Sequence, residues 1–138
     1  MQKRILMSAL GVLLSGFLIF GAVSYFNHQT ELKRNREYEM SLAKALKNSY
    51  KDIKEIQFSD PSYSDKPGGW DVKVQLTFRD GVRLMYRTGY HLGDTVNHDS
   101  IFSGPTLDEE SDKLKSRVGY TENQIKVIYS MKTEVILK

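Results

Sequence analysis

The residues best suited to bind a metal ion gather in one short stretch, which holds His91, Asp94, His98 and Asp99. Imidazole nitrogens and carboxylate oxygens together can coordinate a divalent cation. The spacing His-x2-Asp-x3-His-Asp matches no recognised metal motif, and loops collect Asp because its side chain stabilises turns. The sequence therefore predicts no metal site and no cofactor.

Sequence motifs typical of nucleophilic catalysis are absent from the chain. The chain has no cysteine, no Gly-x-Ser-x-Gly turn and no glycine-rich phosphate loop. The densest group of acids is Asp108, Glu109, Glu110 and Asp112. These acids begin a predicted helix, where the helix dipole favours negative charge without any acid–base role. We therefore expect no catalytic residues and predict that the protein is not an enzyme.

Binding is the more promising chemistry, and the first candidate surface lies on the outward side of a predicted hairpin. Its members are Lys73, Gln75, Arg83, Met85 and Arg87. Three bases around an amide and a thioether make a basic patch that would receive an acidic protein surface or an anionic polymer. The alternative interpretation is a solvated sheet face whose long side chains are mobile.

The second candidate surface is the segment of residues 60–70, which is dense in turn-forming residues. Tyr63 would stand there on an exposed tip beside prolines and glycines, an arrangement that is common in recognition loops. The alternative is a plain connector, after which Trp70 packs in the core. Tyr63 therefore joins the patch residues as a candidate binding residue.

The register of the hairpin decides which side chains share a face. Apolar and polar residues alternate along residues 70–78 and again after the following turn. A two-residue loop would put Phe78 opposite Arg83 and mix apolar side chains with arginines on one face. A three-residue loop, residues 79–81, avoids this and places Gly81 in the left-handed conformation. The predicted pairs on the buried face are then Phe78–Val82, Leu76–Leu84, Val74–Tyr86 and Trp70–Tyr90.

Hydrophobic periodicity predicts the elements before the hairpin. Apolar residues at steps of three and four predict a helix over residues 30–51. Its charged first part, residues 31–39, we expect to extend from the bilayer as an exposed stalk. Residues 54–58 predict a short strand and residues 59–69 a loop.

The elements after the hairpin are less regular. Residues 91–105 predict a long loop with room for a short strand, and a capping-box pattern predicts a second helix within residues 106–119. Residues 124–137 are rich in Ile, Val and Tyr and predict one or two strands. The alternative for that last segment is a helix capped by Thr121 and Gln124.

This order of elements predicts an α+β domain. We expect two layers, with an antiparallel sheet of four to five strands packed on one long helix. Cystatin-like domains have this general plan, and the likeness is an analogy of architecture alone.

Residues 5–26 contain no charged side chain. At about 1.5 Å per residue, a helix of this length covers the roughly 30 Å hydrocarbon core of a bilayer. One alternative is a signal peptide cleaved after Ser24, since small residues precede that bond, and another is a buried helix of a soluble protein. Because the apolar run is longer than a signal peptide usually needs, we predict an uncleaved transmembrane anchor.

The basic tip before this segment, Lys3 and Arg4, predicts an N-terminus in the cytoplasm and a domain outside the cell membrane. The predicted parts are a cytoplasmic tip (1–4), a transmembrane anchor (5–26), a juxtamembrane stalk helix (27–37) and an extracytoplasmic α+β domain (38–138). Beyond the tip, 18 Lys and Arg stand against 17 Asp and Glu. That balance is too even to predict a nucleic-acid partner.

The features that carry a resemblance are the tip MQKRI, the apolar span, the charged juxtamembrane helix and the segments IKEIQF and PGGWDVKV. In these features the chain resembles small single-pass membrane-anchored proteins of unknown function from streptococci and related Gram-positive bacteria. Some proteins of that shape are implicated as immunity factors beside secreted toxins. The resemblance implies a role of that kind at the membrane, and it implies no role for any particular residue.

We therefore expect a membrane-tethered extracytoplasmic domain that binds a protein and protects against a secreted toxin. The alternative is a non-catalytic accessory subunit of a cell-envelope or secretion complex, held through the anchor and the stalk. The expected partners are membrane lipid around the anchor and a protein that the sequence does not identify.

Overall fold

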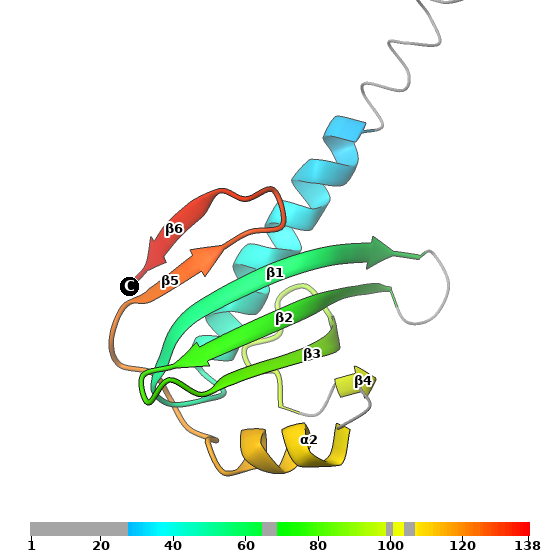
Figure 1. Ribbon diagram of the computed structural model, residues 1–138. Coiled ribbons are helices and arrows are strands. Elements are labelled where there is room, and N and C mark those ends of the chain that lie inside the picture. The colour runs from blue at the N-terminus through cyan, green and yellow to red at the C-terminus, as the bar shows by residue number, and fades with distance from the viewer. Residues whose placement is uncertain (1–27, 65–68, 99–100, 104–106) are drawn as a thin grey trace, which may run out of the picture. The chain divides into compact units, whose positions relative to one another are not determined.

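The computed structural model describes residues 28–64, 69–98, 101–103 and 107–138. The chain divides into two units, residues 1–34 and residues 35–138. The second unit is an α+β domain built on one mixed sheet, which Figure 1 shows in side view. In chain order, its elements after the N-terminal helix are β1 (Ile53–Tyr63), β2 (Trp70–Phe78), β3 (Arg83–Tyr90), β4 (Ile101–Ser103), α2 (Leu107–Lys115), β5 (Ile125–Ile128) and β6 (Glu134–Leu137).

The sheet has six strands in the order β4-β3-β2-β1-β5-β6. All neighbouring strands are antiparallel except β1 and β5, which are parallel. The expectation of an antiparallel sheet of four to five strands is therefore wrong in strand number and in direction. The long connection through α2 returns the chain to the other side of β1, and parallel neighbours require a crossover connection of this length.

The N-terminal helix spans residues 28–47. From Asn35 onward it belongs to the second unit and covers one face of the sheet (Figure 1), where Leu42, Ala45 and Leu46 are buried. The predicted end at residue 51 is wrong. Tyr50 shares the apolar spacing of the helix, and its amide still donates to the carbonyl of Leu46 at 3.1 Å, but the chain leaves the helix there and Tyr50 forms an isolated β-bridge with Val118.

The predicted exposed stalk of residues 31–39 is wrong at two positions. Asn35 is buried and accepts a hydrogen bond from the indole nitrogen of Trp70 at 3.0 Å. Glu39 is fully buried and faces the turn between β5 and β6, where Ser130 donates to it. The local pattern predicts that polar residues on a helix face solvent, yet Asn35 and Glu39 have hydrogen-bond partners that are distant in the sequence.

The hairpin of β2 and β3 has the predicted register. Trp70 pairs with Tyr90, Val74 with Tyr86 and Leu76 with Leu84. The loop has three residues, and the amide of Phe78 donates to the carbonyl of Val82 at 2.9 Å. Gly81 has φ +88°, a left-handed conformation that costs a residue without a side chain little. The apolar side chains of both strands consequently face the helix.

The first strand is longer than predicted, and the predicted loop is correspondingly shorter. β1 continues to Tyr63, and a register shift between Ser59 and Ser62 lets it pair with the start of β2. Asp60 has φ +50° at this irregularity. A bulge absorbs residues that would otherwise end a strand, including Pro61, which has no amide hydrogen to donate.

The C-terminal segment forms two strands, so the alternative helix capped by Thr121 is wrong. The strand β5 buries Ile125 and Val127, and β6 pairs with it in antiparallel fashion. The tight turn between them is closed by a hydrogen bond from the amide of Tyr129 to the carbonyl of Thr133 at 2.9 Å. The side chain of Thr121 instead accepts from the amide of Ile53 and donates to the carbonyl of Tyr50.

The short helix α2 lies within residues 106–119, where the sequence predicts a second helix. The residues that follow it attach it to the central hairpin. Leu114 is buried in the core. The Arg117 guanidinium lies 4.2 Å from the ring centre of Phe78 and forms an ion pair with Asp80 at 2.7 Å. The hydrogen bond from Arg117 holds the pKa of the Asp80 carboxyl below its ordinary value.

None of the helices in the described residues is both long enough and apolar enough to span a membrane. The segment for which the sequence predicts a transmembrane anchor, residues 5–26, lies outside the described residues.

Candidate functional site

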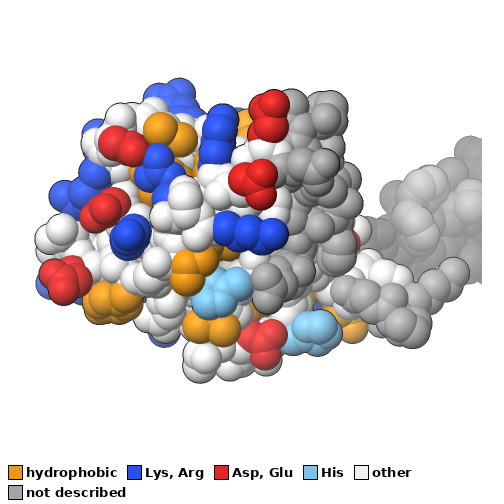
Figure 2. Space-filling model, turned by 90° about the horizontal axis from the view of Figure 1, so that it is seen from below, with side chains coloured by type: hydrophobic (Ala, Val, Ile, Leu, Met, Phe, Trp, Pro, Cys, Tyr) orange, Lys and Arg blue, Asp and Glu red, His pale blue; other side chains and the backbone are white. Residues whose placement is uncertain are grey.

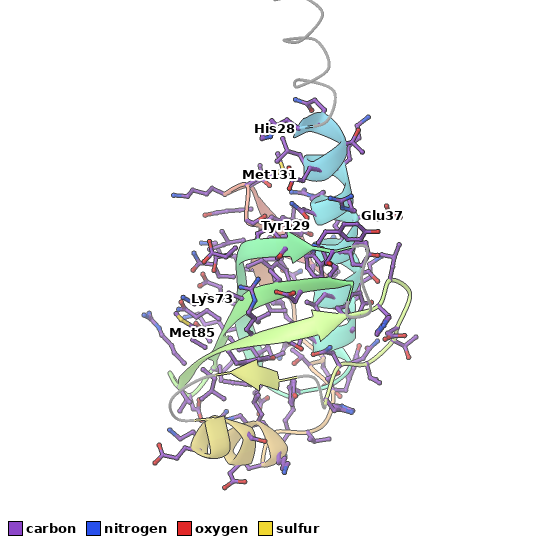
Figure 3. All side chains as sticks on the ribbon, turned by 90° about the vertical axis from the view of Figure 1, so that its right-hand side faces the viewer. His28, Glu37, Lys73, Met85, Tyr129 and Met131 are labelled. Carbon is purple, nitrogen blue, oxygen red and sulfur yellow. The ribbon has the colours of Figure 1, made fainter. Side chains whose placement is uncertain are left out.

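The side of the sheet away from the N-terminal helix is here called the outer face. Alternate residues of each strand point to opposite faces, so the register identifies its central members. Figure 3 shows Lys73 and Met85 on this side. The members on β1, β2 and β3 are Glu55, Gln57, Ser59, Asp71, Lys73, Gln75, Thr77, Arg83, Met85 and Arg87.

Four of the predicted binding residues stand together on the outer face. Gln75 is directly opposite Met85, and the rows on either side contain Lys73 and Arg83. Met85 is 44% exposed. Among the residues that the structure describes, neither Lys73 nor Arg83 has an ion pair or a side-chain hydrogen bond. The result is an exposed thioether flanked by two bases whose charges are not neutralised.

Arg87, the fifth member of the predicted patch, is engaged within the domain. Its guanidinium forms an ion pair with Asp71 and donates a hydrogen bond to the carbonyl of Asp60 at 2.9 Å. Arg87 faces Lys73 across the strands, and like charges at such positions repel. The adjacent carboxylate of Asp71 draws Arg87 away from Lys73, so the patch is less basic than its three bases suggest.

Tyr63 does not belong to the same surface. It ends β1 and pairs with Trp70, whose side chain is buried on the helix side of the sheet. Directly opposed residues in an antiparallel sheet share a face, so Tyr63 lies on the side opposite to Lys73. Tyr63 is 41% exposed. The predicted loop tip is therefore the end of a paired strand.

The sequence interpretation missed the contribution of β1 and of one acid. Gln57 pairs with Gln75, and Ser59 pairs with Lys73, so the outer face extends beyond the hairpin. Asp71 could have been found, because it shares the two-residue alternation of Lys73 and Gln75. Gln57 and Ser59 could not, since nothing in the local pattern states which strand lies beside β2.

Charges of both signs are interspersed over the molecule as seen in Figure 2, from below the view of Figure 1. At the far side of the outer face, Glu55 is next to Lys126, and Lys126 lies 3.7 Å from Glu134. Among the described residues, Lys73 and Arg83 beside Met85 are bases of the outer face that form no ion pair. An anionic partner would meet a local electrostatic site and not a uniformly basic domain.

The histidines and acids of the loop after β3 do not converge. His91 lies 4.0 Å from Asp94 at the surface, whereas the Nε2 atom of His98 is 3.2 Å from the carbonyl oxygen of Ser49. Asp99 lies outside the described residues. In the described ranges, no three His, Cys, Asp or Glu side chains are placed to hold one metal ion.

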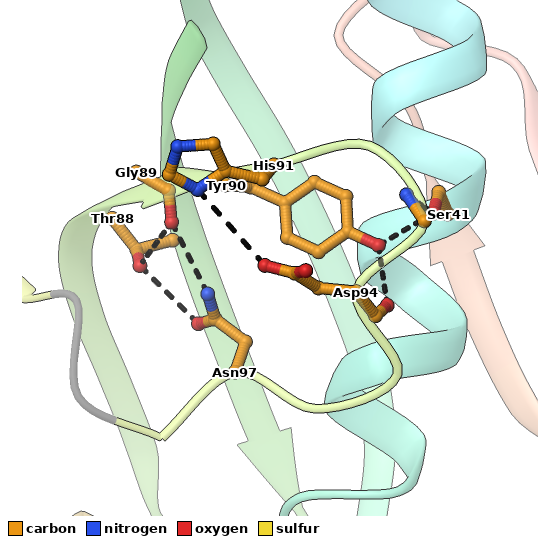
Figure 4. A network of polar contacts seen from close by, with 8 residues as sticks. Ser41, Thr88, Gly89, Tyr90, His91, Asp94 and Asn97 are labelled. Carbon is orange, nitrogen blue, oxygen red and sulfur yellow. Dashed lines mark hydrogen bonds and ion pairs between the residues drawn. The ribbon is translucent and has the colours of Figure 1, made fainter. Parts of the chain in front are cut away.

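Polar contacts tie this loop to the domain, as Figure 4 shows. The hydroxyl of Tyr90 donates to the carbonyl of Asp94 at 2.7 Å and also contacts Ser41 of the N-terminal helix. The side chain of Asn97 donates to the carbonyl of Gly89 at 3.1 Å and contacts Thr88. These contacts position the loop. They also use the hydroxyl of Tyr90 and the side-chain amide of Asn97 within the fold.

Glu39 is the acid whose surroundings most resemble those of a catalytic carboxyl. Burial raises its pKa, while hydrogen bonds from Ser130 and the nearby Arg36 guanidinium act in the opposite direction. The Ser130 amide donates at 2.8 Å and its hydroxyl at 3.0 Å, to different oxygens of the carboxylate. Both oxygens are thus used inside the fold, and the fully buried side chain offers no surface to a substrate.

Comparison with known proteins adds no relative to this description. No protein-family model matches the chain, and no curated protein and no solved structure matches it significantly.

Proposed function

We propose that the chain is a non-catalytic protein-binding domain held at the outer surface of the cell membrane by residues 5–26. In this proposal the part of the outer face around Met85 binds the partner. The observation that supports it most directly is the pairing of an exposed Met85 with two unneutralised bases, Lys73 and Arg83, on the rigid central strands. Thioethers adapt their shape to a partner, and flanking bases steer an acidic surface toward it.

The proposed partner is a protein with an acidic rim around an apolar side chain. Lys73 and Arg83 would remain at the wet edge of the contact, where charges act mainly on the rate of association. Gln57 and Gln75 would supply hydrogen bonds beside Met85. By the resemblance described above, a secreted toxin against which the producing cell is protected is the partner that we propose.

The test places a photoreactive amino acid at position 85 of the full chain in living cells. Val118, which is also exposed, receives the same amino acid as the matched site outside the outer face. A partner that cross-links at position 85 and not at position 118 supports the proposal. Equal labelling at both positions, or none at position 85, would contradict it.

Charge reversal at the site gives the second readout. The change Lys73→Glu with Arg83→Glu should abolish cross-linking at position 85, because it puts like charges against an acidic rim. The matched control is Lys44→Glu with Lys113→Glu, which makes the same change in net charge at exposed positions away from the outer face. If the cross-linked protein is a toxin, cells with the first pair of changes should lose protection and cells with the control pair should keep it.

The same labelled chain separates this role from that of an accessory subunit held through its anchor. A chain that begins at residue 28 retains the described part of the N-terminal helix, including Asn35 and Glu39, which the domain buries. A binding domain should still capture its partner in this form. Loss of capture with the circular dichroism spectrum unchanged would favour the accessory role.

A further inference from the structure

A second interaction surface lies at the end of the sheet, on β6. The strand order ends there, so no other strand in the described part of the chain pairs with its second side. Val135 and Ile136 are 39% and 54% exposed. An edge strand with apolar side chains and unpaired backbone groups is a template for a further strand.

The hydrogen bonds of the neighbouring hairpin show which backbone groups are free. In antiparallel strands, alternate residue pairs exchange hydrogen bonds. The bond from Tyr129 to Thr133 marks one such pair, and the register repeats it at Val127 with Val135. The amide and carbonyl of Ile136, and likewise of Glu134, therefore point away from β5 toward the open side.

We propose that β6 pairs in antiparallel fashion with β6 of a second copy of this chain, with Ile136 on the two-fold axis. Two-fold pairing at this position places Glu134 opposite Lys138 of the second copy, twice by symmetry. It also places Val135 opposite Leu137, and Ile136 against its own counterpart. The sequence Glu-Val-Ile-Leu-Lys at residues 134–138 is thus complementary to itself in charge and in apolar character.

The directions of the backbone hydrogen-bonding groups favour this register over registers that are shifted by one or two residues. Glu134, Ile136 and, by the same alternation, Lys138 present their backbone groups to the open edge, so each can exchange hydrogen bonds across the axis. A shift by one residue would set them against residues whose groups are already bonded to β5. A shift by two would oppose Glu134 to Ile136 and leave Lys138 without its counterpart.

The ion pair of Glu134 with Lys126 in its own chain does not exclude a contact with Lys138 of the second copy. Lys126 lies 3.7 Å from one carboxylate oxygen, and both side chains are about half exposed. A carboxylate has several acceptor positions, so it can meet Lys138 of a second copy while keeping this contact.

The first experiment uses cross-linking of the full chain in detergent micelles. The natural sequence has no cysteine, so Ile136→Cys creates a single reactive thiol on the proposed axis. In a hydrogen-bonded antiparallel pair the Cα atoms are about 5.5 Å apart, within the range that a disulfide spans. We expect Ile136→Cys to oxidise to a covalent dimer, while Val96→Cys, at an exposed site in the loop after β3, stays monomeric.

The second experiment measures the dissociation constant of the dimer by sedimentation in the same micelles. Ile136→Pro removes an amide hydrogen that points away from β5, so it should abolish the dimer and leave the circular dichroism spectrum unchanged. Glu134→Lys should raise the dissociation constant by about tenfold, since it turns two attractive cross-strand pairs into repulsive ones. Glu134→Lys with Lys138→Glu restores opposite charges and should return the constant to that of the natural chain.

Three results would overturn the proposal. The first is a natural chain that stays monomeric at every concentration measured. The second is a dimer that persists in Ile136→Pro, which would assign association to another part of the chain. The third is cross-linking of Ile136→Cys no faster than that of Val96→Cys.

Discussion

In the central hairpin, all five helix-facing side chains of β2 are at most 1% exposed. Those of β3 are buried as well, from Leu84 to Tyr90. In the terminal hairpin, only β5 contributes fully buried side chains, and Val135 and Ile136 of β6 remain exposed. The two hairpins share antiparallel pairing and a tight turn, yet they are attached to the domain in different ways.

Ile125 and Val127 of β5 lie in the core, but the turn of the terminal hairpin is held by polar contacts from the N-terminal helix. Glu39 accepts from Ser130, the Arg36 guanidinium lies 3.7 Å from the ring centre of Tyr129, and Arg36 also donates to Thr133. Apolar burial is non-directional and grows with area, whereas these contacts depend on geometry and charge. We therefore expect the central hairpin to unfold together with the whole domain, and the terminal hairpin to unfold by itself.

The largest effect is expected from Trp70→Ala in the central hairpin. The change opens a cavity, removes the ring contact with Tyr38 and leaves the Asn35 side chain without its buried donor. We expect the free energy of unfolding to fall by about 3–5 kcal/mol. Urea unfolding of the full chain in detergent, followed by far-ultraviolet circular dichroism, measures this, with Trp70→Phe as the milder control. A loss below about 1 kcal/mol would refute the central role of this hairpin.

The second effect concerns the terminal hairpin. Glu39→Ala leaves the amide and hydroxyl of the half-buried Ser130 without their charged acceptor, which costs about 1–3 kcal/mol. Hydrogen exchange should accelerate in β5 and β6 while the amides of β2 keep their protection. An equal acceleration of hydrogen exchange in all four strands of the two hairpins would show that the hairpins do not unfold separately.

Glu39→Gln is the matched variant, because its amide oxygen can still accept from Ser130, and it also tests the pH dependence. Burial raises the pKa of Glu39 in the folded chain. The folded state then holds the proton more tightly, so this stabilisation is complete below the ordinary Glu pKa of about 4.3 and is lost as the pH rises through the higher folded value. The stability of the natural chain should therefore fall relative to Glu39→Gln between pH 4 and pH 7. A difference that does not change with pH would contradict the raised pKa.

A smaller effect is expected for Arg36→Met, which keeps the length of the side chain and removes its charge. Loss of the contact with Tyr129 and of the hydrogen bond to Thr133 should cost about 1 kcal/mol. The change should appear as faster hydrogen exchange confined to the terminal hairpin. Lys44→Met, at an exposed position of the same helix, serves as the control and should leave exchange there unaltered.

The smallest effect has the opposite sign. Within the described residues, the buried hydroxyl of Tyr86 has no hydrogen-bond partner, and burial raises its pKa well above the ordinary value. Removing a buried hydroxyl that has lost its water relieves an uncompensated cost. We expect Tyr86→Phe to raise the free energy of unfolding by up to about 1 kcal/mol. A clear destabilisation in the same urea experiment would mean that the hydroxyl has a partner.

Local pattern was enough for the central hairpin and for the four outer-face residues that stand together. Alternation over residues 70–78 and a glycine in the turn allow one register that buries every apolar side chain, and this register correctly predicts the face on which Lys73 and Arg83 lie. The same reasoning failed for Arg87, because its partner lies on the neighbouring strand. It failed for Tyr63, because a bulge extended the strand into a segment that reads as a turn.

The sequence by itself determined the α+β class, the central register and the existence of strands near the C-terminus, since each follows from periods of two or about four residues. Only the tertiary structure decided that β5 runs parallel to β1, that β6 is the last strand of the sheet in the described part of the chain, and that Asn35 and Glu39 are buried. The physical reason is that these outcomes depend on pairs far apart in the chain. A carboxylate at position 39 looks solvated until Ser130, 91 residues later, folds against it.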